Sequence, residues 1–116
     1  MLVIEDEPVI RHAVAEFLED SGYEVAQAED GPDALASMRV SVPDVVIVDL
    51  QLPTMGGSEF VQEMRADPRL AAVPIVILSA APDLAEAAEA LGARGALAKP
   101  FHLDILLAVI DRVSQS

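Results

Sequence analysis

The sequence predicts an α/β protein: a doubly wound, five-stranded parallel sheet with helices on both faces. Hydrophobic periodicity alternates five times between short apolar runs typical of buried strands and the wider spacing typical of amphipathic helices. Strands separated by helices form βαβ units, whose right-handed crossovers build a parallel sheet. For five such units the common strand order is 2-1-3-4-5.

The composition of the chain limits the classes of function that it can have. The 116 residues fit one domain, residues 1–116, and 53% of them are hydrophobic but only 3% aromatic, so the core is aliphatic. The lack of cysteine excludes disulfides and thiolate metal sites, and a net charge of −13 argues against direct nucleic-acid binding. We find no apolar run of membrane-spanning length and no secretory signal, and we expect a cytoplasmic protein without membrane contact.

The first strand and helix follow from residues 1–22. Residues 1–5 are the first predicted strand, and Pro8, a favoured first-turn residue, begins the helix that follows. Ser21-Gly22 ends that helix. Its apolar side chains recur at i, i+3, i+4, i+7 and i+8, which predicts one core-facing stripe of Ile10, Ala13, Val14, Phe17 and Leu18.

The second unit spans residues 23–42. We predict the second strand over residues 23–28. The turn Asp30-Gly31-Pro32 begins the second helix, which carries Ala34, Leu35 and Met38 on its inner face. Pro43 then precedes the third strand, residues 45–49, which is apolar until its last residue.

A turn-rich loop at residues 53–57 leads into the third helix, whose inner face has Phe60, Val61 and Met64. The fourth strand, residues 74–79, starts at a proline, which a strand tolerates at its first position. The fourth helix, residues 83–91, has mostly small inward side chains: Leu84, Ala87, Ala88 and Leu91.

The last unit begins after Gly92. Gly92 and Gly95 bracket the turn into the fifth strand, residues 96–98, and the final helix follows over residues 102–113. Its sheet-facing side chains are Leu103, Leu106, Leu107, Ile110 and Val113. Ile105 and Val109 lie beside that stripe, which predicts a contact surface for a partner or a second copy.

Charged and hydroxyl side chains follow four of the predicted strands. Glu5 ends the first strand and Asp6 follows it, Asp49 ends the third, Ser79 ends the fourth and Lys99 follows the fifth. In the order 2-1-3-4-5, the first and third strands flank the switch point where ligands bind in such sheets. The sequence therefore places three carboxylates, a hydroxyl and the only lysine at one edge of the sheet.

Three carboxylates in one cleft repel each other by on the order of 4 kcal/mol per close pair at an effective dielectric constant near 20. A hard divalent cation relieves this repulsion. Oxygen ligands without histidine or cysteine favour Mg²⁺, or Mn²⁺, over zinc. A carboxylate nucleophile beside such an ion, an ammonium and a hydroxyl is a plausible phosphoryl acceptor.

Four motifs, in order along the whole chain, together resemble the receiver domain of response regulators, with a flavodoxin-like, CheY-like (βα)5 fold. These are Glu5-Asp6-Glu7-Pro8, the segment from Asp49 to Gly57 with a proline four and a glycine eight residues after the aspartate, Ile77-Leu78-Ser79-Ala80, and Lys99-Pro100-Phe101. The resemblance implies a switch of two-component signalling rather than an enzyme acting on other substrates.

The resemblance also implies roles at the acceptor. Asp49 would take a phosphoryl group from a histidine kinase or a histidine phosphotransfer protein. Glu5, Asp6, Asp49 and the backbone carbonyl of Gln51 would hold Mg²⁺, and Lys99 would pair with the phosphoryl oxygens.

Further implied roles concern the switch. Ser79 would move toward the phosphate and pull the loop before the fourth helix, and the bond before Pro100 would be cis. The chain departs from the family at Ala96, where many members carry an aromatic ring. The switch would therefore act mainly through Ser79 and the fourth helix, and reach a homodimer or effector through the fourth helix, fifth strand and fifth helix.

Other functions compete with this one. The chain is also compatible with a receiver belonging to a longer DNA-binding response regulator or hybrid kinase. A flavodoxin-like enzyme would need a phosphate-cradling loop after the first strand, where Glu5, Asp6 and Glu7 instead stand. A degenerate receiver that signals without phosphate is disfavoured by Asp49, Ser79 and Lys99.

Overall fold

The computed structural model describes residues 1–52 and 54–115. The strands are β1 (Leu2–Ile4), β2 (Ala26–Ala28), β3 (Val46–Asp49), β4 (Ile75–Ser79) and β5 (Gly95–Ala98). The helices are α1 (Pro8–Asp20), α2 (Gly31–Val40), α3 (Gly57–Ala66), α4 (Leu84–Leu91) and α5 (Leu103–Ser114). All strand pairs are parallel and the order is β2-β1-β3-β4-β5, as predicted.

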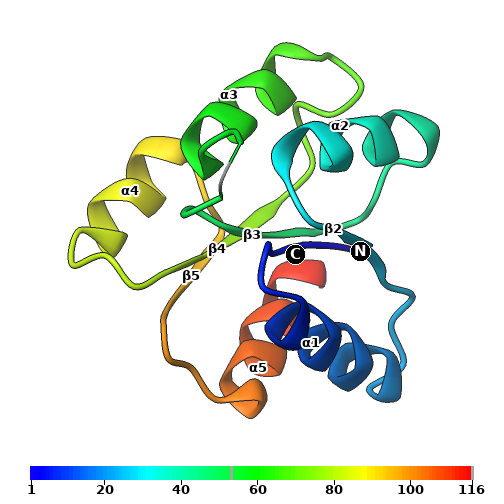
Figure 1. Cartoon of the computed structure of the whole chain (residues 1–116), viewed down its shortest axis with the longest axis vertical. Coiled ribbons are helices and arrows are strands. Elements are labelled where there is room, and N and C mark those ends of the chain that lie inside the picture. Colours follow the sequence, from blue (N-terminus) through cyan, green and yellow to red (C-terminus); the bar gives the residue numbers. More distant parts are fainter. Residues whose placement is uncertain (53, 116) are drawn as a thin grey trace.

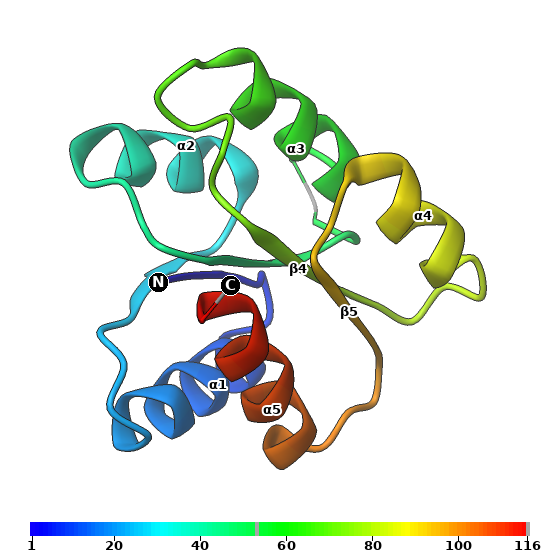
Figure 2. The ribbon, with the colours of Figure 1, turned by 180° about the vertical axis from the view of Figure 1, so that it is seen from behind.

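The helices form two layers around the sheet. Helices α2, α3 and α4 cover one face, and α1 and α5 cover the other (Figure 1, Figure 2). Within the described residues, no helix is both long and apolar enough to cross a membrane.

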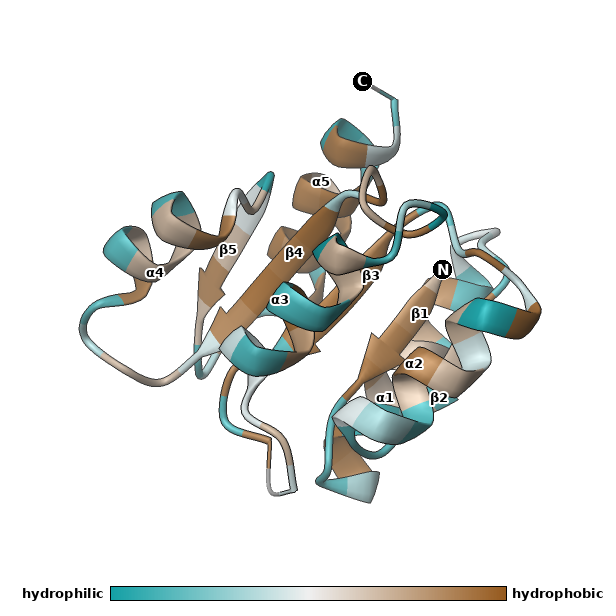
Figure 3. Ribbon diagram, turned by 90° about the horizontal axis from the view of Figure 1, so that it is seen from above, coloured by the Kyte–Doolittle hydropathy of each residue, from teal (hydrophilic) through white to brown (hydrophobic). Residues whose placement is uncertain are grey.

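Each face of the sheet has its own hydrophobic cluster, because successive strand residues point to opposite faces. Val46 and Val48 of β3 pack toward α2 and α3, whereas Ile47 packs toward α1 and α5. The central strands are apolar along their length while the helices keep polar residues on their outer faces (Figure 3). In β1, β3 and β4 the polar side chains therefore stand at or just after the carboxyl end of the strand.

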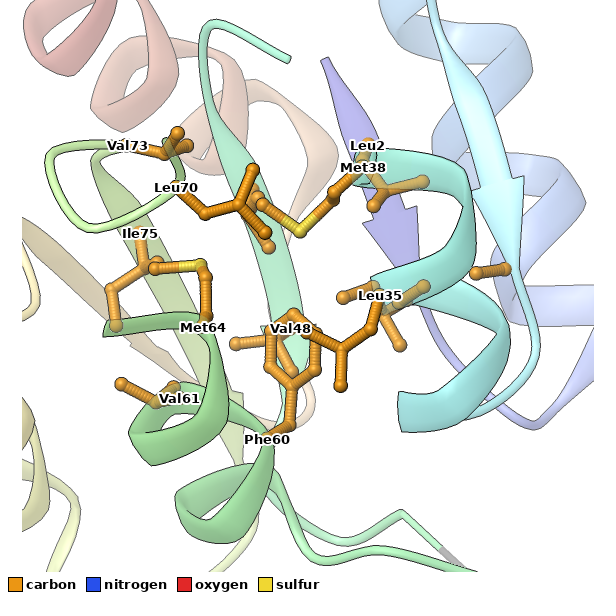
Figure 4. Close-up of a cluster of buried hydrophobic side chains, with 14 of the residues drawn as sticks. Leu2, Leu35, Met38, Val48, Phe60, Val61, Met64, Leu70, Val73 and Ile75 are labelled. Atoms are coloured by element: carbon orange, nitrogen blue, oxygen red, sulfur yellow. The ribbon is translucent and has the colours of Figure 1, made fainter. Parts of the chain in front are cut away.

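The larger cluster joins α2 and α3 to the sheet. Leu35 and Met38 of α2 meet Phe60 and Met64 of α3 over Val48 (Figure 4). These five side chains are almost fully buried, and each contributes roughly 1.5–3 kcal/mol of transfer free energy. The inward residues predicted for these two helices are confirmed.

Helix α4 is attached more weakly than the other helices. None of its residues is fully buried, and Leu84, Ala87, Ala88 and Leu91 are half-buried against the cluster. Small side chains bury little apolar area, so α4 is held by little hydrophobic free energy.

The turn predictions hold in detail. The Asp30 side chain accepts a hydrogen bond of 2.8 Å from the Asp33 amide and so caps α2. Gly22, with φ of 101°, follows the C-cap of α1, and Gly92, with φ of 66°, is the C-cap of α4. Only glycine adopts such left-handed backbone without strain.

The second strand is shorter than predicted. Residues 23–25 lie outside β2, which pairs with β1 only from Leu2 opposite Ala26 onward. The Tyr23 amide instead donates to the carbonyl of Leu18 and helps close α1. The apolar pattern extended the strand too far because no partner strand runs beside residues 23–25.

Two helix faces also differ from prediction. Ile10 and Ala13 of α1 are exposed, and only Val14, Ala15 and Leu18 of that helix are buried. In α5, Ile105 is exposed as expected, but Val109 packs against Gly95 of β5. A Cβ on Gly95 would lie 2.6 Å from Val109 Cγ1, so the glycine is what lets the partly buried Val109 pack closely on β5.

Candidate functional site

The carboxyl ends of β1, β3 and β5 bring Glu5, Asp49 and Lys99 together. Lys99 Nζ donates to Glu5 Oε1 at 2.6 Å and to Asp49 Oδ2 at 2.5 Å. Glu5 and Asp49 are 1% and 2% exposed, whereas Lys99 is half-buried. Residues 5, 49 and 99 are far apart in the chain, and only the parallel strand order brings them to one point.

Burial shifts the protonation of this group. The pKa of Glu5 is raised to about 7: desolvation is the largest cause, Lys99 opposes the shift and the nearby Asp49 adds to it. Burial by itself would lower the pKa of Lys99, but its hydrogen bonds to Asp49 and Glu5 outweigh that and raise it. The ammonium therefore stays charged between its two carboxylates.

The acidic residues fit a divalent cation. Glu5, Asp6 and Asp49 each offer a carboxylate oxygen, and these oxygens lie within 4.8 Å of one another. Glu5 Oε2 is buried and has no hydrogen-bond partner among the described residues. When all three carboxylates are ionised they exceed the one ammonium by two negative charges, which an oxygen-liganded divalent ion would balance.

Asp49 is further fixed by the loop that follows it. The Gln51 amide donates to Asp49 Oδ1 at 2.9 Å, so each oxygen of this carboxylate has a donor. The predicted role of the Gln51 carbonyl as a metal ligand remains a prediction. Ser79 ends β4 beside β3 and is 1% exposed, and its Oγ accepts from the Ala81 amide at 3.0 Å.

The loop after β3 folds back tightly at Gly57. The Gly57 amide donates to the carbonyl of Leu50 at 3.0 Å, and a Cβ at Gly57 would lie 2.5 Å from Leu50 Cα. The glycine eight residues after Asp49 is therefore required by close backbone approach. Pro53, the other residue of that motif, lies outside the described residues.

Two further predictions concern the residues in and just after the fifth strand. The Lys99–Pro100 bond is cis, as expected. Ala96 is half-buried against the α2–α3 side of the core and presents only a methyl group. The structure thus has no aromatic ring at the position where the resemblance would often place one.

An apolar depression borders Lys99, and the sequence analysis missed it. We call it the α1 hollow; it measures about 490 Å³ and is lined by Val9, Ile10, Ala13, Val14, Ala80, Lys99, Pro100, Phe101 and Leu103. Val9 is 75% exposed and Ile10 37%. The sequence did contain a signal, since α1 carries more apolar residues than one core stripe needs.

A second hollow of about 590 Å³ lies at the opposite edge of the sheet, around the starts of β1 and β3. It contains none of the predicted site residues. The candidate site therefore lies at the edge of the sheet that holds Asp49.

Arg11 is a second residue that sequence reasoning missed. Its guanidinium Nη1 donates to the backbone carbonyl of Glu5 at 2.9 Å, and its Nε donates to Gln27 Oε1 at 3.3 Å. No spacing rule links residue 11 to the end of a strand, so only the folded geometry reveals this contact.

Comparison with known proteins agrees with this geometry. Residues 1–111 match the family model of the response regulator receiver domain. The chain is 40% identical over 114 residues, 96% of its length, to the transcriptional regulatory protein PdtaR of Mycobacterium tuberculosis, and these residues are 54% of that protein. It spans about half the length, 49% to 54%, of several curated relatives that it matches.

Solved structures give the same fold. The chemotaxis response regulator CheY4 of Vibrio cholerae superimposes with a TM-score of 0.89 at 38% identity, over 97% of this chain and 95% of that one. The receiver domain of the sensor histidine kinase PA1611 of Pseudomonas aeruginosa has a TM-score of 0.88 at 31% identity, over 99% and 96% of the two chains. That structure has a magnesium ion coordinated in its active-site cleft.

Proposed function

The chain belongs to the response regulator receiver domain family, and from this premise we propose that it is a phosphorylation-controlled switch whose acceptor is Asp49. The observation that carries the proposal is the placement of Asp49. Its carboxylate lies buried at the end of β3 between the Gln51 amide and Lys99. A fixed nucleophile with donors around it favours transfer of a group whose transition state gathers negative charge.

Phosphoryl transfer to Asp49 exchanges one bond to phosphorus for another. A carboxylate oxygen of Asp49 forms the new bond to phosphorus while the phosphorus–nitrogen bond of a phosphohistidine donor breaks. The donor imidazole leaves with the electron pair and takes a proton. Lys99 Nζ, which in the unphosphorylated protein bonds Glu5 and Asp49, then neutralises a phosphoryl oxygen.

Glu5, Asp6 and Asp49 would hold Mg²⁺, or Mn²⁺, together with the backbone carbonyl of Gln51. When bound, the ion supplies positive charge beside the transferred phosphoryl group. The spacing of the three carboxylates supports this assignment, as does Glu5 Oε2, which has no hydrogen-bond partner in the described part of the chain. The protein's own contribution is to hold the carboxylates close together against their repulsion.

Signal output would begin at Ser79. Its Oγ now accepts from the Ala81 amide, in the segment that leads to α4. Turning this hydroxyl to donate to a phosphoryl oxygen would shift its contact with Ala81 and move residues 80–83. Because α4 has no fully buried residue, little packing opposes its displacement.

The α1 hollow offers the phosphodonor a place to dock. It is apolar, it is open to solvent at Val9, and Lys99 forms part of its lining. A histidine kinase or phosphotransfer protein that packs an apolar surface there would bring its phosphohistidine to the edge that holds Asp49. In this proposal the chain catalyses only its own phosphorylation and dephosphorylation.

What the switch controls can be inferred from a curated relative. PdtaR is a transcriptional regulatory protein by name, and this chain corresponds to about half of it. We therefore propose that the switch controls an effector region, on the same polypeptide or on a partner, through protein contacts. With a net charge of −13, the chain itself is poorly suited to bind DNA.

The proposal is tested by intact-mass measurement after incubation with a small phosphodonor and Mg²⁺. Wild-type protein should gain one phosphoryl group that is labile to base, and Asp49→Asn should gain none. Asp44→Asn, which changes an exposed acid just before β3, is the matched control and should behave as wild type. Equal base-labile incorporation in Asp49→Asn would refute the assignment.

A further inference from the structure

We propose that Arg11 is a positioning residue of the metal site, acting by holding the backbone that carries Glu5 and Asp6. The inference deepens the proposed function and rests on it. Arg11 is on the first turns of α1, and its guanidinium reaches back to the end of β1.

Three contacts define the arrangement. Arg11 Nη1 donates to the Glu5 carbonyl at 2.9 Å, Nε donates to Gln27 Oε1 at 3.3 Å, and the Arg11 amide donates to the Glu7 carbonyl at 2.9 Å. The planar guanidinium thus bridges β1 and β2, while its backbone forms the first turn of α1.

The turn between β1 and α1 has few other restraints. The Glu5 amide donates to the Ala28 carbonyl at 3.1 Å, beyond the last residue pair of β1 and β2. Glu7, the N-cap of α1, makes no side-chain capping bond, and Pro8 has no amide hydrogen. The Arg11 fork therefore supplies the restraint on the Glu5 carbonyl that a helix cap or strand ladder would otherwise provide.

The effect of Arg11 is conveyed through the backbone. The Glu5 carboxylate already has its counter-charge from Lys99, and the Arg11 contact is with the carbonyl of the same residue. Glu5 is buried, whereas Asp6 is exposed. The position of the Asp6 side chain therefore depends on the backbone of this turn rather than on burial. Without the fork, the two carboxylates would be free to move apart under their mutual repulsion.

The test is Mg²⁺ affinity, measured by amide chemical shifts during titration with MgCl₂. Arg11→Met removes both side-chain donors but keeps the apolar stem, and should weaken Mg²⁺ binding about tenfold, the lower end for groups that orient metal ligands. Gln27→Leu removes only the second anchor and should weaken it about twofold to threefold. Arg11→Lys keeps the charge but not the fork, and should fall between wild type and Arg11→Met.

Arg39→Met is the matched control, because it removes an exposed arginine charge on α2 and should leave the Mg²⁺ affinity unchanged. Wild-type affinity in Arg11→Met would overturn the inference, and wild-type affinity in Arg11→Lys would show that charge alone matters. Should Arg11→Met fail to fold, unchanged affinity in Gln27→Leu overturns it. A wild-type protein without Mg²⁺ binding would instead refute the proposed function.

Discussion

At the scale of single residues, Glu5 has the most altered environment in the site. Its folded pKa of about 7 lies above the ordinary value of 4.5, because burial disfavours its charged form. The native protein keeps this proton where the unfolded chain has lost it. The contribution to stability is therefore full below pH 4.5 and is lost as the pH rises through 7.

We expect the metal-free protein to lose up to about 3 kcal/mol of unfolding free energy from this one group between pH 4.5 and pH 7. Glu5→Gln should remove that part of the pH dependence. Urea denaturation in EDTA at a series of pH values measures it, with Glu29→Gln, an exposed acid, as the control. A wild-type slope in Glu5→Gln would contradict the environment described for Glu5.

Lys99 is the counter-charge for two buried carboxylates. Lys99→Met should destabilise the metal-free protein by about 1–3 kcal/mol, less than for a fully buried pair because Lys99 is partly exposed. Added Mg²⁺ should restore much of the loss, since the cation replaces the missing charge. Thermal melts with and without Mg²⁺ measure both effects.

Arg69→Met removes an equally charged but exposed side chain and should change neither melt appreciably. If Mg²⁺ raised the melting temperature of Lys99→Met no more than that of wild type, the cation and the ammonium would not share the same carboxylates.

At the scale of elements, the loop between β3 and α3 determines how Asp49 is presented. Gly57→Ala should destabilise the protein by about 2 kcal/mol, because the new Cβ would lie 2.5 Å from Leu50 Cα and the backbone must shift. That shift should also disturb the Gln51 amide and slow phosphoryl uptake at Asp49.

Gly56→Ala is the neighbouring control. Its Cβ would meet nothing within 4 Å and its φ is −60°, so the cost should stay below about 1 kcal/mol, mainly from the weaker N-cap. Denaturant unfolding and intact-mass time courses compare the two variants. Equal effects at both positions would show that close packing on Leu50 is not the reason for the glycine.

At the scale of the whole molecule, the expected output surface lies over α4, β5 and α5. Ile105 is 52% exposed there, whereas Val109 is partly buried against Gly95. Of the two residues predicted for a contact patch, Ile105 is therefore the more exposed. Val109→Glu would also disturb the packing of Val109 on Gly95, so Ile105→Glu is the more specific test of association.

We expect a stable phosphate mimic with Mg²⁺ to promote association through this surface, and Ile105→Glu to weaken it at least several-fold. Sedimentation velocity or light scattering measures the effect. Val40→Glu changes a 90% exposed valine at the end of α2 and should not alter association. A monomer in both states, without partner binding at this surface, would refute the expectation.

Local sequence predicted the structure correctly wherever the residues of one strand or helix determine its conformation. Periodicity located all ten elements, and the parallel order followed from their alternation. It failed for residues 23–25, where a strand needs a neighbour, and for Ile10 and Ala13, whose apolar side chains face the α1 hollow rather than the core. Each failure concerns a residue whose surroundings come from distant parts of the chain.

The sequence by itself determined the fold, the edge of the sheet that carries the site and the identity of its charged residues. These depend on periodicity and on the fixed handedness of βαβ units. Only the tertiary structure decided that Lys99 bonds both Glu5 and Asp49, that Arg11 holds the Glu5 carbonyl, and that Gly95 admits Val109. Such contacts depend on distances between atoms that chain order leaves unspecified, because packing of separate elements sets them.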